Sequence, residues 1–313
     1  MMQASRALLF AAVSLLMPTF SVLAQQNRAT VVVELFTSEG CSSCPPADAL
    51  LARLGRDQPI LNVDIIVLGE HVDYWDSLGW HDRFSSPYLT LRQKTYQSFF
   101  NLDDVYTPQI VVSGSAQFTG TDSEGISSAI KKAAAQTVPL QFTSVEVHGN
   151  SVSFTLKDGP ATHPEYVNVF AALVDPTDTT EVRAGEKGGR TLHHAGVVRW
   201  IGLIGSSWHM KELGRHPFNF EALLPMMSSV VGPSGGGYQS VPITDGMRLV
   251  VFAQTKHIGP ILGAASCVLS TTPVPSAAEA PFPANRCPVA PASVVAAQVV
   301  ALSESSHPGD HLK

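Results

Sequence analysis

Two cysteines, Cys41 and Cys44, are separated by two serines early in the 313-residue chain. At this spacing the sulfurs can close into a disulfide. When reduced, one thiolate can attack an external disulfide and the other can resolve the mixed product. The motif therefore predicts thiol–disulfide exchange. An inert local disulfide uses the same residues, as does a pair of thiolates that binds Cu(I), a soft metal ion.

The residues on either side of the pair predict a strand before it and a helix after it. Residues 30–36 are a β-branched run typical of a buried strand. Pro45 and Pro46 begin a helix that carries three leucines on one face. A helix N-terminus has free N–H groups and a partial positive charge, which stabilise a thiolate. Because residues before proline avoid the helical region, we expect both cysteines in the preceding turn.

The rest of the chain predicts an α/β domain at 28–137 and then a mainly β, sandwich-like domain at 138–270. Further strands and helices give the first domain the order β-α-β-α-β-β-α; they are expected at 62–68, 86–100, 109–113, 116–119 and from 121 onward. In the second domain, apolar residues alternate along short segments, as in strands with one buried face. Residues 271–313 are rich in Pro and Ala and predict a disordered tail.

The order strand, cysteine pair, helix and then Thr107–Pro108 before another strand resembles the thioredoxin superfamily over about residues 30–136. Three segments, 33–48, 71–76 and 105–109, are similar to an exported thioredoxin-like family classed as domain of unknown function 1223. That resemblance runs to about residue 268 and implies fold and location. It implies no substrate, because the family has none assigned.

The resemblance also implies roles for single residues. Cys41 matches the solvent-facing cysteine that attacks, and Cys44 matches the more buried cysteine that resolves the mixed disulfide. Pro108 matches the cis-proline that lies against the dithiol, and Thr107 would offer backbone groups to an extended substrate. Glu34 lies near the position of a buried acid that shuttles a proton to the resolving cysteine. The two central serines leave the direction of electron flow open.

A loop at 69–85 is rich in aromatic and titratable residues, and it begins at the C-terminal end of a predicted central strand. In open α/β sheets ligands bind at that edge. We expect four side chains near this edge to contact substrate: His71, Tyr74, Trp75 and Tyr106. His71 could also transfer protons. The alternative is a small aromatic core capped by charges, which we favour for Trp80 and His81. A later group is interpreted as structural ion pairs: Arg183, Arg190, His193, His194 and Arg199.

The first 24 residues are typical of a secretory signal: Arg6 precedes an apolar run, and Val22-Leu23-Ala24 is a small-residue cleavage site. The protein is therefore expected outside the cytoplasm, periplasmic or secreted. Cleavage removes one arginine and no acid, so the net charge changes from −6 to −7. This charge argues against nucleic acid as a partner, and no later segment is apolar enough to span a membrane.

In an exported protein, the remaining cysteines Cys267 and Cys287 are expected to form a structural disulfide that ties down the tail. The leading hypothesis is an exported thiol–disulfide oxidoreductase without a cofactor. It would act on a protein or small-molecule disulfide or dithiol and on an unknown redox partner. The alternatives are a copper-handling protein with His71 as third ligand and a binding module without turnover. No standard metal motif is present.

Overall fold

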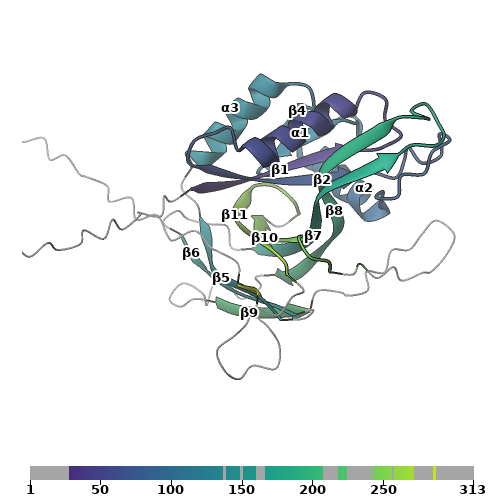
Figure 1. Ribbon diagram of the computed structural model, residues 1–313. Coiled ribbons are helices and arrows are strands. Elements are labelled where there is room, and N and C mark those ends of the chain that lie inside the picture. Colours follow the sequence, from purple (N-terminus) through teal and green to yellow (C-terminus); the bar gives the residue numbers. More distant parts are fainter. Residues whose placement is uncertain are drawn as a thin grey trace, which may run out of the picture.

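The computed structural model describes residues 28–136, 139–148, 151–159, 166–206, 218–223, 241, 243–255, 257–270 and 285–286. The expected signal at 1–24 and Cys287 lie outside these residues, as does all of the expected tail at 271–313 except 285–286. The described residues form a mixed eight-stranded sheet, a smaller four-stranded sheet and helices on both faces of the larger one (Figure 1). No helix among them is both long and apolar enough to span a membrane.

The elements follow one another as β1 (Ala29–Thr37), α1 (Pro45–Asp57), β2 (Val63–His71), α2 (Pro87–Phe99), β3 (Gln109–Val112), β4 (Ala116–Thr119), α3 (Ser123–Ala134), β5 (Leu140–His148), β6 (Ser151–Asp158), β7 (Val167–Glu181), β8 (Thr191–Ser206), β9 (Phe218–Leu223), β10 (Arg248–Thr255), β11 (Ile261–Val268) and β12 (Asn285–Arg286). Up to residue 136 these are the elements predicted from the sequence, with ends that differ by a few residues. The α/β class is therefore confirmed.

The large sheet has the strand order β11-β10-β7-β8-β2-β1-β3-β4. β1 pairs in parallel with β2 and antiparallel with β3. β8 joins the other edge of β2 in parallel, with Gly69 opposite Val197. Strands from the expected second domain therefore continue the first sheet, and a separate β domain is not confirmed. The ranges 28–137 and 138–270 stay predictions.

The small sheet has the order β12-β5-β6-β9 and packs against the extension of the large one. Phe142 of β5 and Phe154 of β6 share one apolar core with Leu173 of β7 and Val251 of β10. Two packed sheets are thus present, as a sandwich requires. One of them, however, is the continued α/β sheet.

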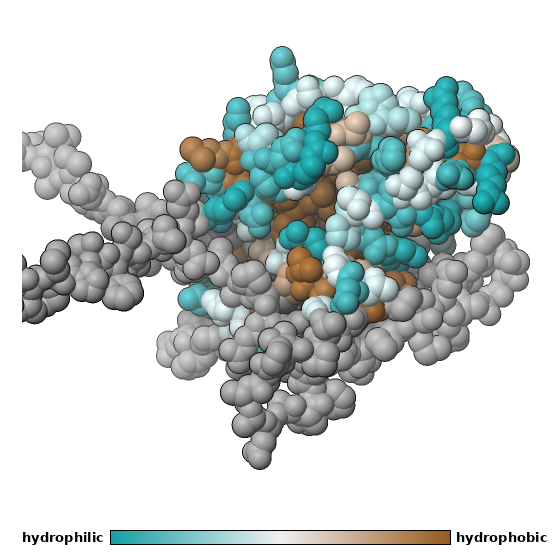
Figure 2. All heavy atoms as spheres, viewed as in Figure 1, coloured by the Kyte–Doolittle hydropathy of each residue, from teal (hydrophilic) through white to brown (hydrophobic). Residues whose placement is uncertain are grey.

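The helices bury alternate residues of the central strands from opposite sides. Val33 and Leu35 of β1 face α1 and α3, where they share a core with Leu51. Val32, on the other face of β1, packs with Leu89 of α2. The surface over α1 and α3 is mainly hydrophilic, as expected for helices that bury only one face (Figure 2). At one edge of the sheet the C-terminal ends of β1 and β2 lie side by side, and the start of α1 and the loop before α2 are hydrogen-bonded to residues at or just after the end of β1.

Candidate active site

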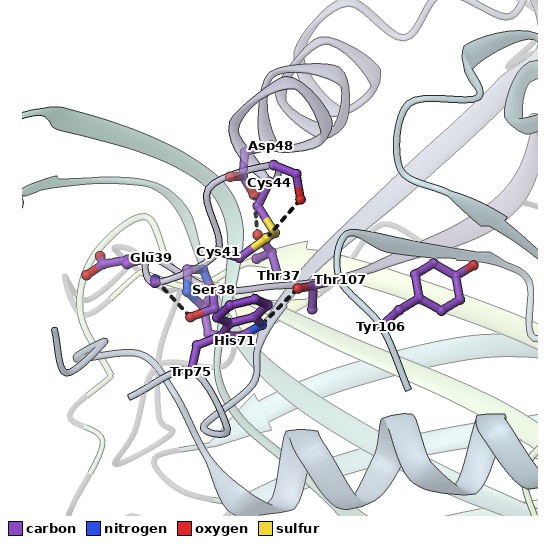
Figure 3. Close-up of a disulfide and its surroundings, with 12 residues drawn as sticks. Thr37, Ser38, Glu39, Cys41, Cys44, Asp48, His71, Trp75, Tyr106 and Thr107 are labelled. Carbon is purple, nitrogen blue, oxygen red and sulfur yellow. Dashed lines mark hydrogen bonds between the residues drawn. A yellow bond between two sulfur atoms is a disulfide. The ribbon is translucent and has the colours of Figure 1, made fainter. Parts of the chain in front are cut away.

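Cys41 and Cys44 form a disulfide at the N-terminus of α1 (Figure 3). Cys44 is the residue that precedes the helix, and its carbonyl accepts hydrogen bonds from the N–H groups of Ala47 at 2.9 Å and Asp48 at 3.1 Å. The helix begins at Pro45, so both cysteines lie before α1, as predicted. The reason given for that prediction is wrong, however, because Cys44 has helical backbone angles (φ −76°, ψ −33°) although a proline follows it. The N-terminal end of the helix dipole is directed at the pair, which favours negative charge on sulfur.

Cys41 does not face solvent, contrary to the prediction: both cysteines are 0% exposed. We attribute the burial of Cys41 to the loop before α2, which packs on the turn that carries Cys41 and is hydrogen-bonded to it. The N–H of Glu39 donates to the Asp82 carboxylate at 2.8 Å. Gly40 packs so closely on Trp75 that an added Cβ would lie 2.9 Å from the Trp75 Cβ. Long-range packing thus covers a sulfur that its place in the motif would leave open.

Thr107 and Pro108 lie at the same end of α1. The bond between them is cis, as predicted. Pro108 and Ala47, of the first turn of α1, both adjoin Gly120: an added Cβ there would lie 2.8 Å from the Pro108 Cβ and 2.5 Å from the Ala47 Cβ. The indole N–H of Trp75 donates to the Thr107 hydroxyl at 2.9 Å (Figure 3). The proline turn therefore lies near the first turn of α1 and is hydrogen-bonded to the loop before α2.

Glu34 does not serve Cys44, so the predicted role is wrong. Its carboxylate accepts hydrogen bonds from Arg92 of α2 at 2.7 Å and from the Tyr96 hydroxyl at 3.1 Å, and all three side chains are buried. Successive side chains of a strand point to opposite faces. Because Leu35 faces α1, Glu34 points to the α2 side of the sheet and away from the cysteine pair.

Asp48, which the sequence analysis did not select, lies next to Cys44 instead (Figure 3). It is buried in the first turn of α1, and its carboxylate accepts a hydrogen bond from the Thr37 hydroxyl at 2.8 Å. Burial raises the pKa of Asp48, and the positive charges of His194 and His71 act in the opposite direction. The sequence does place an acid one helical turn after Cys44, and this spacing could have identified Asp48. Acidic residues are common in the first turn of helices, however, so the position alone does not indicate a role at the cysteine pair.

His71 forms a buried pair with Asp82. The distance from Nδ1 to the carboxylate oxygen is 2.6 Å, and the imidazole ring also contacts Phe84 and His194. Burial opposes the charged form of His71, but the carboxylate of Asp82 raises its pKa above the ordinary value. Burial also opposes the ionised form of Asp82, but the charge of His71 and its hydrogen bond lower the pKa of Asp82 below the ordinary value. The geometry therefore favours an imidazolium–carboxylate pair at the edge of the sheet.

The three aromatic residues expected to contact substrate take different positions. Trp75 lies against the turn that carries Cys41, as described. Tyr74 donates its hydroxyl to Gln93 of α2 at 3.1 Å, and burial raises its pKa to about 12. The carbonyl of Tyr106 accepts from the same Gln93 side chain at 2.7 Å, and the Tyr106 ring points away from the disulfide (Figure 3). The structure therefore brings Trp75 to the pair, but not Tyr106.

Cys267 is buried in the core between the two sheets and is disulfide-bonded. Its expected partner, Cys287, lies outside the described residues, so the pairing stays a prediction. Within the described ranges, no three His, Cys, Asp or Glu side chains are grouped as ligands for one metal ion. The copper alternative requires such a third ligand beside the two sulfurs.

The fold and the site define an α/β protein with a mixed sheet and a buried disulfide at a helix N-terminus. The chain matches the family described as "Protein of unknown function (DUF1223)" over residues 32–226, more than half of its length, and belongs to that family. Protein AGR_C_4864 from Agrobacterium tumefaciens has a similar fold, with 24% identity and a TM-score of 0.59 over 80% of this chain and 100% of that one.

HBP35 of Porphyromonas gingivalis is a more distant structural match, with 14% identity and a TM-score of 0.48 over 80% of each chain. No curated protein matches the chain.

Proposed function

We propose that the protein is an exported thiol–disulfide oxidoreductase with a thioredoxin-like arrangement and Cys41–Cys44 as its redox pair. The observation that carries the proposal is the position of the disulfide. It lies at the N-terminus of α1, whose first turn adjoins Gly120 from one side while the cis Thr107–Pro108 turn adjoins it from another. A structural disulfide needs neither neighbour, whereas an exchanging pair uses the helix to stabilise a thiolate.

The proposed reaction transfers two electrons and two protons between this pair and a partner dithiol. A thiolate of the partner attacks the sulfur of Cys41, the Cys41–Cys44 bond breaks, and Cys44 leaves as a thiolate and takes up a proton. The second thiol of the partner then attacks the mixed disulfide and releases Cys41, which is protonated in turn. The partner ends as a disulfide. The same steps in reverse reduce a disulfide in a protein or a small molecule and regenerate the Cys41–Cys44 disulfide.

Asp48 is the residue that we propose exchanges a proton with Cys44. It lies beside Cys44 and away from solvent, and burial raises its pKa, which makes it a better proton donor near neutral pH. The Thr37 hydroxyl holds the carboxylate in place. In this proposal Asp48 takes the role that the sequence resemblance implied for Glu34.

The disulfide is also consistent with the expected export, since disulfides persist outside the cytosol and are rare within it. An oxidising compartment would hold the pair in the form described here. The signal expected at residues 1–24 remains the basis for this part of the proposal. N-terminal sequencing of the protein recovered from periplasm or medium would test cleavage after Ala24.

The decisive experiment is to trap the intermediate. Reduced wild type, Cys41→Ser and Cys44→Ser are each mixed with a model disulfide substrate, and covalent adducts are counted by mass spectrometry. We expect Cys44→Ser to accumulate a mixed disulfide through Cys41 and Cys41→Ser to trap little. Ser42→Ala, an exposed position between the cysteines, serves as control and should behave like wild type. Negligible trapping by both cysteine variants, together with tight Cu(I) binding by reduced wild type, would overturn the assignment.

A further inference from the structure

Strands β7 and β8 continue as a two-stranded ribbon beyond the point where β8 joins β2. We call residues 177–195 the arm; its strands pair from Thr177 opposite Ala195 to Glu181 opposite Thr191. The arm extends toward the loops at the edge of the sheet that carries the disulfide (Figure 1). It therefore brings residues from the second half of the chain to the end of the sheet where the candidate site lies.

The arm is attached to the loop before α2 by polar contacts and by close packing. Arg83 of the loop donates to the carboxylate of Asp178 at 2.6 Å and to the Thr180 hydroxyl at 3.2 Å. Gly185 has a left-handed φ of +70° and lies so close to Trp80 that an added Cβ would be 3.1 Å from the Trp80 Cβ. The loop and the arm are therefore packed together.

Glu39 and Gly40 are the central residues of a four-residue turn that ends at Cys41. The N–H of Cys41 donates to the Ser38 carbonyl at 3.1 Å, and this hydrogen bond closes the turn. The N–H of Gly40 donates to the Ser38 hydroxyl at 3.0 Å. Because the turn is short and internally hydrogen-bonded, a displacement of Glu39 is passed on to Cys41.

Glu39 joins this turn both to the loop and to the arm. Its N–H donates to the Asp82 carboxylate at 2.8 Å, and one oxygen of its own carboxylate accepts from the indole N–H of Trp80 at 2.7 Å. The other oxygen lies 3.3 Å from Nε2 of His194 on the arm. Glu39 is 1% exposed and His194 is 4% exposed. A single buried residue, two positions before Cys41, thus contacts both neighbouring segments.

The contact between Glu39 and His194 is the least secure of these attachments. Its two atoms are within the distance of an ion pair, but within the described residues neither this oxygen nor either ring nitrogen of His194 makes a hydrogen bond. The imidazole otherwise makes ring contacts, with centroid distances of 4.8 Å to His71 and 5.8 Å to Phe84. Buried polar groups without hydrogen bonds regain them from water on exposure, which lowers the cost of separating the arm from the turn.

We propose that Glu39 and His194 are positioning residues that control access to Cys41: their contact keeps the turn closed, and its separation lets a partner thiolate reach the Cys41 sulfur. An opening step is required because both sulfurs belong to residues that are 0% exposed. This inference rests on the proposed function. The two residues act through the turn and not in the exchange itself, so their effect belongs in the rate at which the disulfide becomes reachable.

The test measures how fast glutathione reduces the disulfide in the full chain, by alkylation and mass spectrometry of the peptides that contain Cys41 and Cys44. His194→Leu removes the imidazole, and Glu39→Gln removes the facing charge but keeps an acceptor for Trp80. Each should raise the rate about tenfold, and the double variant should be no faster than the faster single variant, because both changes break one contact. His194→Gln keeps a donor near the position of Nε2 and should return the rate toward the wild-type value.

His193→Leu is the matched control, because His193 precedes His194 on the same strand but is exposed, and it should leave the rate unchanged. Hydrogen exchange of the slowest amides, which reports global unfolding, should be equal in all these proteins. If wild type is reduced faster than it unfolds but His194→Leu and Glu39→Gln only match it, this inference alone fails. A rise in reduction with an equal rise in exchange of the slowest amides would overturn it too. If every protein is reduced no faster than it unfolds, the proposed function fails as well.

Discussion

The Thr37 hydroxyl donates a hydrogen bond of 2.8 Å to the buried carboxylate of Asp48 and thereby joins the end of β1 to the first turn of α1. A threonine that ends a strand and an acid that begins a helix are ordinary features on their own. Together they fix a carboxyl group beside Cys44, on the same face of the sheet as α1. This pair gives the first prediction.

Asp48→Asn should slow the reduction of Cys41–Cys44 by a dithiol at least about tenfold, because the departing Cys44 thiolate would lose the proton donor that we propose for it. The rate is followed by stopped-flow mixing with dithiothreitol at neutral pH. Asp57→Asn is the matched control, since Asp57 is an exposed acid at the other end of the same helix. Equal rates for Asp48→Asn and Asp57→Asn would remove Asp48 from the mechanism.

Trp75→Ala should make the disulfide easier to reduce. Trp75 packs on the turn that carries Cys41 and is held by Thr107. Removing the indole should expose the buried sulfur and raise the rate of reduction by a small monothiol by roughly tenfold, and Thr107→Val should give a smaller increase of the same sign. Leu78→Ala alters an exposed side chain of the same loop and should have no effect. Unchanged reduction in Trp75→Ala would show that another group limits access to Cys41.

Asp82→Asn should destabilise the fold by about 3 kcal/mol, because it leaves His71 buried without its counter-charge. The folded-state pKa of His71 is raised and that of Asp82 is lowered. The contribution of the His71–Asp82 pair to the free energy of unfolding is therefore fully present at pH values between the ordinary pKa of an aspartic acid and that of an imidazole. It fades as pH falls through the depressed pKa of Asp82 or rises through the raised pKa of His71.

Urea denaturation across this pH range tests the prediction, with His81→Gln as control. His81 pairs with Asp76 at 2.8 Å but is largely exposed, so its loss should cost less than about 1 kcal/mol. A stability loss in Asp82→Asn that is the same at every pH would argue for packing and against the ion pair.

Glu70→Gln should stabilise the protein above weakly acidic pH. Glu34 and Glu70 are both buried beside one cation, Arg92, and both oxygens of Glu70 lack a hydrogen bond within the described residues. Burial and the charge of Glu34 raise the pKa of Glu70 well above its ordinary value. The folded state thus holds a proton that the unfolded state has lost, and wild-type stability falls as pH rises through this interval.

The gain in Glu70→Gln should be roughly 1 kcal/mol or more at neutral pH and should vanish in acid. Glu34→Gln provides the contrast, because Glu34 makes the closer contacts with Arg92, and its loss should destabilise. Thermal unfolding at two pH values measures both. Stabilisation by Glu34→Gln and destabilisation by Glu70→Gln would reverse the assignment of the two carboxylates.

Local patterns carried most of what the sequence could predict. β-branched runs and helix caps gave the elements before residue 136, because these depend on neighbouring residues. Pairing between distant strands does not depend on neighbours: nothing within β8 indicates that it joins the free edge of β2. The burial of Cys41 has the same long-range origin.

The prediction about Glu34 is a different case, because the sequence itself contained the information needed to reject it. The alternation along β1 puts Leu35 on the α1 side, and counting one residue back puts Glu34 on the opposite side. Strand parity alone would have excluded it as a partner of Cys44. The acid that does lie on the correct side, Asp48, requires knowledge of how the end of β1 meets the helix.

The parallel pairing of β2 with β8 also limits how the chain could be divided. A fragment that ended before β5 would keep Cys41 and Cys44 but would leave β2 with an uncovered row of N–H and C=O groups where β8 now pairs. Such an open edge is a template for pairing with other chains, so the fragment should self-associate. The segment with the Cys41–Cys44 disulfide would therefore have to be expressed together with the strands far beyond it in the chain.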